Sequence, residues 1–332
     1  MRTLVTGGTG YIGSHTVVAL LEAGHDVLIV DNLANSRADV VDRIERICGR
    51  RPGFVRGDVR DGALMRCLLE DSGIEGVLHF AALKAVGESW EHAIEYYDTN
   101  VAGSIALLGA MYATGVGRLV FSSSATVYGE ADTQPVTEAA PCAPGNPYGR
   151  TKWMVEQVIA DLPPAFSTVV LRYFNPAGAH SSGLIGESPS GVPNNLFPYV
   201  ADVAGGERPH LRIFGDDYAT PDGTGVRDYI HIEDLAEAHV AALRHAAEGP
   251  RRAVFNIGTG RGYSVREVAC AFEAASGRPV PCVVEARRPG DAAQCYADPT
   301  LAGEVLGWRA TRDLRRMCED AWRWKAGDAG VA

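Results

Sequence analysis

Hydrophobic residues gather in short runs, and longer segments with helical spacing separate these runs. The runs in the first half are Leu4-Val5, Val27 to Val30, Phe54-Val55, Val77 to Phe80, Leu119 to Phe121 and Thr168 to Leu171. Between the first two runs, residues 14–23 place apolar side chains on one face, and Gly24 follows as a helix stop. Strands that alternate with helices predict an α/β fold, a Rossmann-type doubly wound parallel sheet with helices on both faces.

This rhythm breaks after about residue 176. Glycine and proline gather in 176–198 and again in 221–225, and short strands expected at 211–214, 253–257 and 280–284 alternate with short helices. A chain of 332 residues is also longer than one simple core usually needs. We therefore expect a dinucleotide-binding domain over 1–176, with strand and helix returns from the C-terminal half, and a smaller α/β substrate lobe over 177–332.

Composition narrows the classes of function. Apolar residues make up 46% and charged residues 22% of the chain, as in ordinary globular proteins. Its apolar runs are too short for a membrane helix, so we do not expect a membrane span. The net charge of −10 argues against a nucleic-acid partner. The 7 cysteines are scattered without C-x-x-C spacing, and a strand-like run follows Met1 directly. We expect a cytoplasmic protein without a metal site, a signal peptide or a membrane partner.

A glycine-rich turn lies between the first strand and the first helix. It reads Gly7-Gly8-Thr9-Gly10-Tyr11-Ile12-Gly13, and the second strand ends at Asp31, about 20 residues further on. Such glycines let a pyrophosphate approach a helix N-terminus, and an acid in this place accepts both ribose hydroxyls. Because Asp31 would repel a 2′-phosphate, the pattern favours NAD over NADP. The alternative is a simple tight turn, with Asp31 as a cap of the next helix.

Further contacts are expected where later strands end. Asp58-Val59 follows the third strand and could contact an adenine, although ordinary loop chemistry is an equal alternative. Phe80-Ala81-Ala82 follows the fourth strand, at the sheet edge where ligands bind in open parallel sheets.

The expected reacting groups are Tyr148 and Lys152, which stand one helical turn apart on one face. A phenol is a poor base at neutral pH, and an adjacent ammonium together with a positive nicotinamide ring would lower its pKa. Ser124 closes the fifth strand and could reach the same substrate hydroxyl. The chain is therefore expected to oxidise a hydroxyl group beside NAD. Taken without the glycine turn, the Tyr148 and Lys152 pair would more simply be a solvated helix pair.

Several segments carry a family resemblance. Residues 6–15, 122–129, 148–152 and 172–176 resemble the extended short-chain dehydrogenase/reductase family, and residues 84–89, 193–196 and 223–231 resemble its UDP-glucose 4-epimerase branch. The likeness runs from Met1 to about Trp324. It implies that Tyr148 takes a proton from the sugar 4-hydroxyl while carbon 4 passes hydride to a retained NAD, and that the 4-keto sugar turns and is reduced on its other face. UDP-glucose and UDP-galactose would thus be interconverted.

The motifs and the resemblance together give a list of site residues. Three are catalytic: Ser124, Tyr148 and Lys152. The cofactor contacts are Gly7, Gly10, Tyr11, Ile12, Gly13, Asp31, Asn32, Asn35, Ser36, Asp58, Val59, Phe80, Ala81, Ala82, Lys84, Asn100, Ser122, Tyr148, Lys152 and Phe174. The substrate contacts are Lys84, Ser124, Tyr148, Asn175, Asn194, Asn195, Leu196, Arg212, Phe214, Arg227, Arg288, Asp291 and Cys295.

Within this list the resemblance gives Arg227 and Arg288 to the substrate diphosphate and Asp291 to the nucleotide ribose, because forked guanidinium donors suit a diphosphate. Each arginine taken alone would more often form a surface salt bridge. The family is commonly homodimeric through two helices, here 91–113 and 148–161.

Two positions depart from the family pattern. Some bacterial members have Asn where this chain has Thr99, so Thr99 is left out and the adjacent Asn100 is included. Cys295 stands where members with a narrow hexose pocket have Tyr. We hypothesise that the smaller thiol admits UDP-N-acetylglucosamine and UDP-N-acetylgalactosamine, and the alternative is a packing residue beside another wall.

The same residues bear on three rival functions. A 4,6-dehydratase would need an Asp-Glu pair near Ala125, Thr126 and Val127, where this chain has none. An epimerase or decarboxylase of a UDP-uronate or UDP-pentose is the runner-up, although a cation for the carboxylate is not evident. An NAD-sensing regulatory module would be expected to lose Tyr148 and Lys152.

Overall fold

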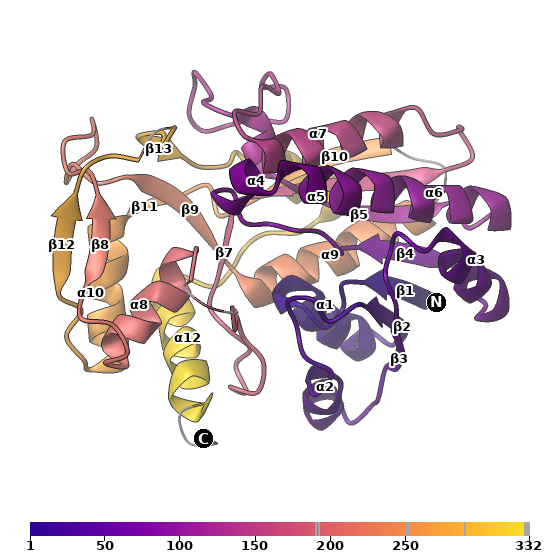
Figure 1. Ribbon diagram of the computed structural model, residues 1–332, viewed down its shortest axis with the longest axis horizontal. Helices are drawn as coiled ribbons and strands as arrows, with labels where there is room; N and C mark the ends of the chain where they lie inside the picture. The colour runs from indigo at the N-terminus through magenta and orange to yellow at the C-terminus, as the bar shows by residue number, and fades with distance from the viewer. Residues whose placement is uncertain (190, 192, 250–251, 289, 329–332) are drawn as a thin grey trace.

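A seven-stranded parallel sheet organises the larger part of the molecule (Figure 1). The computed structural model describes residues 1–189, 191, 193–249, 252–288 and 290–328. The strands are β1 (Arg2–Thr6), β2 (Asp26–Asp31), β3 (Gly53–Arg56), β4 (Gly76–His79), β5 (Arg118–Ser124), β6 (Ser167–Tyr173) and β10 (Arg252–Ile257), in the order β10-β6-β5-β4-β1-β2-β3. The predicted fold class is confirmed, and each of the six hydrophobic runs forms a strand of this sheet.

Helices cover both faces of the sheet, and each face has its own core (Figure 1). One face packs against α1 (Tyr11–Glu22), α2 (Val40–Cys48) and α9 (Ile232–Ala247). The other face packs against α3 (Gly62–Asp71), α6 (Gly103–Thr114) and α7 (Pro147–Ala160). Strands buried on both faces need near-continuous apolar sequence, which is why short hydrophobic runs predicted them well.

The first helix begins three residues earlier than its apolar face predicts. Gly10 is the N-cap of α1, so the helix starts directly from the glycine turn, and Gly24 follows its end with a left-handed φ of 83°. Residues 11–13 belong to the glycine motif, and therefore the sequence analysis placed them in the turn and not in the helix.

Short strands form a second, smaller assembly. β9 (Val226–His231) pairs with β7 (Asn175–Ala177), β11 (Gly262–Ser264) and β13 (Gln294–Cys295), while β8 (Leu211–Phe214) pairs with β12 (Cys282–Glu285). Three helices, α8 (Leu196–Ala204), α10 (Val265–Ser276) and α12 (Leu314–Asp328), pack around a third core, and α11 (Thr300–Leu306) packs near β10. The strands expected at 211–214 and 280–284 thus appear as β8 and β12.

The strand expected at 253–257 was assigned to the wrong part of the molecule. It is β10, and it lies at the edge of the large sheet in parallel register with β6, with Phe255 paired to Leu171. Its buried residues Phe255 and Ile257 belong to the core that α9 completes. Strand returns from the C-terminal half were expected, but the sequence does not reveal that 253–257 is one of them, because its pairing partner lies about 85 residues earlier.

The helix expected over 91–113 is a series of shorter segments. These are α4 (Glu88–Glu91), α5 (Ala93–Tyr96), the π-helical η1 (Tyr97–Ala102) and α6, and they run beside α7 (Figure 1). A π-helical turn inserts one extra residue per turn and is common near functional sites. In the described part of the chain, none of the helices has the length and apolar character required for a bilayer crossing.

Candidate active site

A cavity follows the carboxyl ends of the strands in the large sheet. It is lined by most of the predicted cofactor residues and by part of the predicted substrate set. The predicted residues around it are Gly7, Gly10, Tyr11, Ile12, Gly13, Asp31, Asn32, Asn35, Ser36, Asp58, Val59, Phe80, Ala81, Ala82, Lys84, Ser122, Ser124, Tyr148, Lys152, Phe174, Asn175 and Asn195. Ligands bind at this edge of open α/β sheets.

The glycine turn leaves the first turn of α1 open to this cavity. Gly7 has a left-handed φ of 72°, and a Cβ there would stand 2.7 Å from the backbone nitrogen of Ala81. A Cβ on Gly13 would stand 2.2 Å from the carbonyl oxygen of Gly7. The N-cap Gly10 offers no side-chain cap, and the first turn of α1 has no acidic residue. The free N–H groups of this turn fit the pyrophosphate of a dinucleotide.

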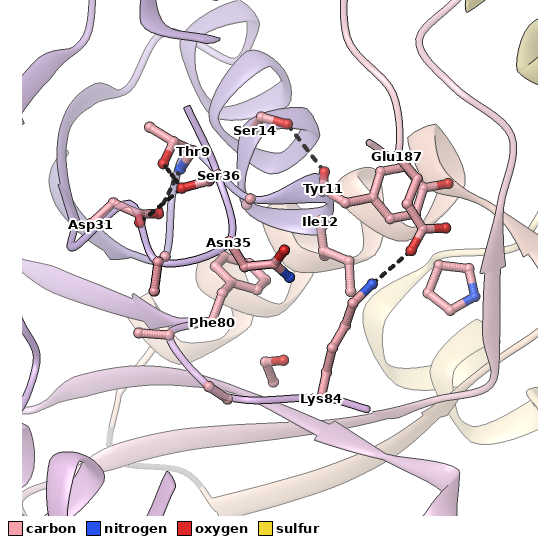
Figure 2. A pocket seen from close by; sticks show the side chains of 18 of the residues that line it. Thr9, Tyr11, Ile12, Ser14, Asp31, Asn35, Ser36, Phe80, Lys84 and Glu187 are labelled. Atoms are coloured by element: carbon pink, nitrogen blue, oxygen red, sulfur yellow. Dashed lines mark hydrogen bonds and ion pairs between the residues drawn. The ribbon is translucent and has the colours of Figure 1, made fainter. Parts of the chain in front are cut away.

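Asp31 faces the same cavity from the end of β2 (Figure 2). One carboxylate oxygen accepts from the backbone N–H of Thr9 (3.1 Å), and the other accepts from Leu33 N–H (2.9 Å) and Ser36 Oγ (3.0 Å). α2 starts only at Val40, with Asp39 as its N-cap, so Asp31 is not a helix cap. The carboxylate is held at the position where a ribose diol would donate to it, and its charge disfavours a 2′-phosphate.

Asp58 is fixed beside this ribose position. Its carboxylate accepts from Asn32 Nδ2 (3.0 Å) and from the guanidinium of Arg60 (2.8 Å). The Arg60 hydrogen bonds hold the pKa of Asp58 well below its usual range. Asp58 therefore stays ionised and available as an acceptor at the far end of the cavity.

Tyr148 and Lys152 lie buried at the inner end of the cavity. They stand on the first turns of α7, where Asn146 caps the helix by accepting from Gly149 N–H (2.8 Å) and Pro147 occupies the first turn. Lys152 Nζ lies 6.0 Å from the centre of the Tyr148 ring and donates to the Ser122 carbonyl oxygen (2.8 Å). Tyr148 and Lys152 are only 8% and 4% exposed, which excludes a solvated surface pair.

Burial controls the titration of this pair in the protein alone. It raises the pKa of Tyr148 to about 12, against a hydrogen bond from Ser124 that lowers it. It lowers the pKa of Lys152 to about 7, against the charge of Glu156 that raises it. The expected activation of Tyr148 by Lys152 is thus outweighed by desolvation, and a positive nicotinamide ring is what would favour the phenolate.

Ser124 is oriented by a neighbour that sequence reasoning missed. The Ser124 hydroxyl oxygen accepts from Thr126 Oγ1 (3.0 Å) and from Thr126 N–H (3.2 Å). Because both lone pairs are then engaged, the Ser124 proton is free to be donated into the cavity, either to Tyr148 or to a substrate oxygen. Tyr173, another missed lining residue, hydrogen-bonds Ser122.

Asn100 does not line the cavity, contrary to the sequence prediction. Its amide donates to the Leu83 carbonyl oxygen (3.0 Å) and to Thr151 Oγ1 (3.0 Å), and its oxygen accepts from Leu83 N–H (2.8 Å). Thr99, which the prediction left out, does line the cavity. The π-helical turn of η1 rotates the helix face here, so Asn100 supports the loop after β4 from behind.

A second group of predicted residues lies outside this cavity. Arg288 lies over the Phe214 ring (4.4 Å to its centre) and pairs with Asp291 (2.9 Å). The Arg227 guanidinium lies 3.8 Å from the same carboxylate of Asp291. Arg212 also lies over Phe214 and pairs with Glu285 (2.6 Å). The structure thus brings these residues together at the ends of β8, β9 and β12, where the arginines form ion pairs.

Three further predicted substrate residues do not line the cavity. Asn194 and Leu196 lie at the start of α8 and do not line the cavity. Cys295 lies on β13 opposite Arg227 and is half-buried in a cluster with Val127, Tyr128 and Phe174. Among these, Phe174 faces the cavity.

Glu187 also lines the cavity, although no sequence motif predicted it. It accepts from Lys84 Nζ (2.6 Å) and Asn195 Nδ2 (2.7 Å), and Figure 2 shows its carboxylate opposite Lys84. Within the described residues there is no group of three or more His, Cys, Asp or Glu that could hold a metal.

Comparisons with known proteins agree with this geometry. Residues 3–258 match the NAD dependent epimerase/dehydratase family. A UDP-glucose 4-epimerase of Neisseria meningitidis serogroup B is 52% identical over 329 residues, which cover 97% of this chain and 96% of that protein.

Two solved structures extend this likeness over 100% of both chains. A Stenotrophomonas maltophila UDP-glucose-4-epimerase with bound NAD and formylated UDP-arabinopyranose is 53% identical with a TM-score of 0.99. A Bifidobacterium longum UDP-glucose 4-epimerase in complex with NAD+ and UDP is 48% identical with a TM-score of 0.94.

Proposed function

The chain belongs to the NAD-dependent epimerase/dehydratase family, and from this membership we propose that it interconverts UDP-glucose and UDP-galactose at carbon 4. The observation that carries the proposal is the buried Tyr148 and Lys152 pair, which lies in one cavity with the open first turn of α1 and with Asp31. The cofactor is NAD. A UDP-uronate or UDP-pentose substrate is not favoured, because the relative at 52% identity is named for glucose.

The chain's own residues supply proton transfer and orientation. Bound NAD supplies the chemistry of taking hydride from carbon 4 and returning it. Tyr148 accepts the 4-hydroxyl proton and later gives it back, and Ser124 donates its free proton to the same oxygen. Lys152 is held on Ser122 beside Tyr148, where its protonated form favours the phenolate. The sugar needs to turn between the two transfers, so its contacts are expected to be weaker than those of the diphosphate.

The arginine group at β8 and β9 is assigned to the diphosphate and nucleotide. Arg227 and Arg288 already lie on either side of Asp291, and Phe214 offers an aromatic face between Arg212 and Arg288. A diphosphate would exchange these surface ion pairs for bidentate contacts of greater strength. This assignment follows the proposed division into an NAD-binding part (1–176) and a UDP-sugar-binding part (177–332).

We extend the proposal to the N-acetylated sugars. Cys295 packs against the cluster that contains Phe174, which lines the cavity, and a thiol fills less space there than a phenol. The extra room supports turnover of UDP-N-acetylglucosamine and UDP-N-acetylgalactosamine.

We also propose a homodimer. The exposed large apolar side chains include Trp90, Ile94, Ile105, Tyr112 and Met154, which come from α4, α5, α6 and α7. These helices pack beside one another, and a gathered apolar surface of this kind is typical of a protein interface. A cytoplasmic location is part of the same proposal, and it is supported by the free state of all seven cysteines, each within the described residues.

The function is tested by incubating the purified protein with UDP-galactose and separating the two epimers by chromatography. Formation of UDP-glucose is expected. Parallel reactions with UDP-galacturonate and UDP-arabinose test the alternative, and conversion of these alone would overturn the proposal.

A further inference from the structure

Glu187 occupies a position at the cavity that the proposed reaction does not use. Its side chain is 9% exposed, and one oxygen, Oε1, accepts from both Lys84 Nζ and Asn195 Nδ2. Its backbone carbonyl oxygen accepts from the indole N–H of Trp324 on α12 (3.2 Å). The backbone of Glu187 is therefore held by Trp324 while its carboxylate binds two side chains at once.

The two partners come from different parts of the molecule. Lys84 follows β4 of the large sheet, whereas Asn195 is the N-cap of α8 in the second assembly. An Asn at an N-cap normally accepts a backbone hydrogen bond with its side chain. Asn195 makes no such capping bond, and its amide donates to Glu187 instead. The Asn195 side chain therefore contacts Glu187 and does not cap its own helix.

The same contact fixes the direction of Lys84. A lysine has a flexible stem, and the Lys84 side chain is 45% exposed, so packing alone does not hold it. The ion pair with Glu187 places Nζ 6.0 Å from the centre of the Tyr11 ring (Figure 2). Tyr11 is the first residue of α1, and its hydroxyl donates to the Gly178 carbonyl oxygen (2.7 Å). Lys84 is thus directed toward the helix end that fits the cofactor pyrophosphate.

The segment before Glu187 is attached across the cavity as well. Arg43 of α2 donates to the Leu184 carbonyl oxygen (3.3 Å) and lies over the Trp324 ring (5.3 Å to its centre). Leu184, Ile185, Gly186 and Glu187 all line the cavity. Residues 184–187 therefore line the cavity and contact two cations of the NAD-binding side, Arg43 and Lys84.

We propose that Glu187 is a positioning residue that holds Lys84 against the cofactor and Asn195 against the sugar nucleotide, and so contributes to both NAD retention and substrate binding. The inference rests on the proposed function, which gives Lys84 to the cofactor and Asn195 to the substrate. Loss of the carboxylate frees a lysine and an amide that face different ligands.

The test compares Glu187→Ala, Glu187→Gln and the control Glu207→Gln. Glu207 also pairs with a lysine, Lys325 (2.6 Å), but its side chain is 57% exposed and does not line the cavity that holds Tyr148. NAD is released from each protein by denaturation after gel filtration and is counted per chain. For Glu187→Ala we expect at least about a tenfold faster loss of NAD during dialysis and about a tenfold higher KM for UDP-galactose, as for a lost charge-assisted hydrogen bond.

A measurement of kcat distinguishes a positioning role of Glu187 from a general disturbance of the active site. With saturating NAD and substrate, kcat of Glu187→Ala is expected to stay within about threefold of the parent, since the Tyr148 site is intact. Glu187→Gln keeps an acceptor oxygen and is expected to recover part of the loss. If Glu187→Ala does not fold, Glu187→Gln alone is compared with Glu207→Gln, and NAD loss equal to that of the control overturns the proposal.

A double-mutant cycle shows whether Glu187 acts through Lys84. If it does, Lys84→Ala and Glu187→Ala together lose NAD no faster than Lys84→Ala alone. Additive losses would overturn the proposal, as would parental NAD retention and KM in Glu187→Ala. NAD retention is measured without turnover, so the cofactor result holds even if the parent fails to convert UDP-galactose, which would refute the proposed function separately.

Discussion

Glu156 of α7 and Arg172 of β6 form an ion pair beneath the catalytic residues, with side chains that are 4% and 6% exposed. Glu156 follows Lys152 by one helical turn and also accepts from Ser123 of β5. Arg172 lies opposite Ser123 in the register of β5 and β6. The pair therefore holds the helix that carries Tyr148 and Lys152 against the strand that carries Ser124.

Removal of one partner is expected to lower both the stability of the protein and its turnover rate. Arg172→Met leaves the Glu156 charge buried without its partner, which costs about 3–5 kcal/mol. The free energy of unfolding, measured by urea denaturation, is expected to fall by that amount, and kcat is expected to fall with it. The surface pair of Arg66 and Glu70 is the control, and Arg66→Met should change stability by less than about 1 kcal/mol. Equal effects of the two substitutions would show that the buried pair has no special role.

The buried Lys152 predicts a pH-dependent stability. Burial lowers its pKa from 10.5 to about 7, so between these values the unfolded chain binds more protons than the folded protein. The destabilising contribution of Lys152 is full below about pH 7 and disappears as pH rises toward 10.5. Cofactor-free Lys152→Met is therefore expected to have a higher Tm than the parent at pH 6.5, with a difference that shrinks by about pH 10.

Lys325 provides a control of opposite sign. Burial lowers the pKa of Lys325, but its ion pairs with Asp202 and Glu207 outweigh this and raise it, so its contribution is stabilising at neutral pH. Lys325→Met is expected to lower the Tm at pH 6.5. A Tm of Lys152→Met below that of the parent at this pH would contradict the account of Lys152.

Substrate breadth is expected to change at Cys295. Cys295→Tyr adds a phenol to the cluster that contains Phe174 and is expected to reduce kcat/KM for UDP-N-acetylgalactosamine by about tenfold to a hundredfold, with little change for UDP-galactose. Cys142 packs in the same cluster, and Cys142→Ser is the matched control. If the parent itself fails to convert the acetylated sugar, or if Cys295→Tyr affects both substrates equally, Cys295 is a packing residue.

The proposed dimer is tested on its exposed apolar side chains. Ile94 and Tyr112 are 82% and 66% exposed, and the double variant Ile94→Lys, Tyr112→Lys would place two charges in the interface. Light scattering coupled to gel filtration is expected to give the mass of two chains for the parent and of one chain for this variant. Val305→Lys changes an exposed apolar residue on α11 and should stay dimeric. A parent that elutes as one chain would contradict the proposal.

The parts of the fold that the sequence predicted well are local ones. Six strands and the glycine turn follow from apolar runs and from spacing within about 30 residues, so pairing partners need not be known. The place of β10 could not be read from the sequence, because Phe255 pairs with Leu171 across a long stretch of chain.

The site residues divide in the same way: those linked by short spacing were predicted, and those that only the fold brings together were not. Tyr148, Lys152 and Asp31 were found from spacing, and Glu156 could have been found too, because it continues the four-residue spacing on the same face of α7. Glu187 had no comparable signal, since its contact with Lys84 joins residues 103 positions apart. Thr99 was left out because some bacterial family members have Asn there, yet Thr99 lines the cavity and Asn100 does not.

The central claim is that Tyr148 carries the proton of a transfer cycle on retained NAD. It is tested most directly with UDP-galactose that has deuterium at carbon 4, added to the purified protein in ordinary water without NAD. We predict UDP-glucose with deuterium still at carbon 4, and a rate about a hundredfold to ten-thousandfold lower for Tyr148→Phe with equal NAD content. Loss of the deuterium to solvent, or an unchanged rate in Tyr148→Phe, would contradict the account.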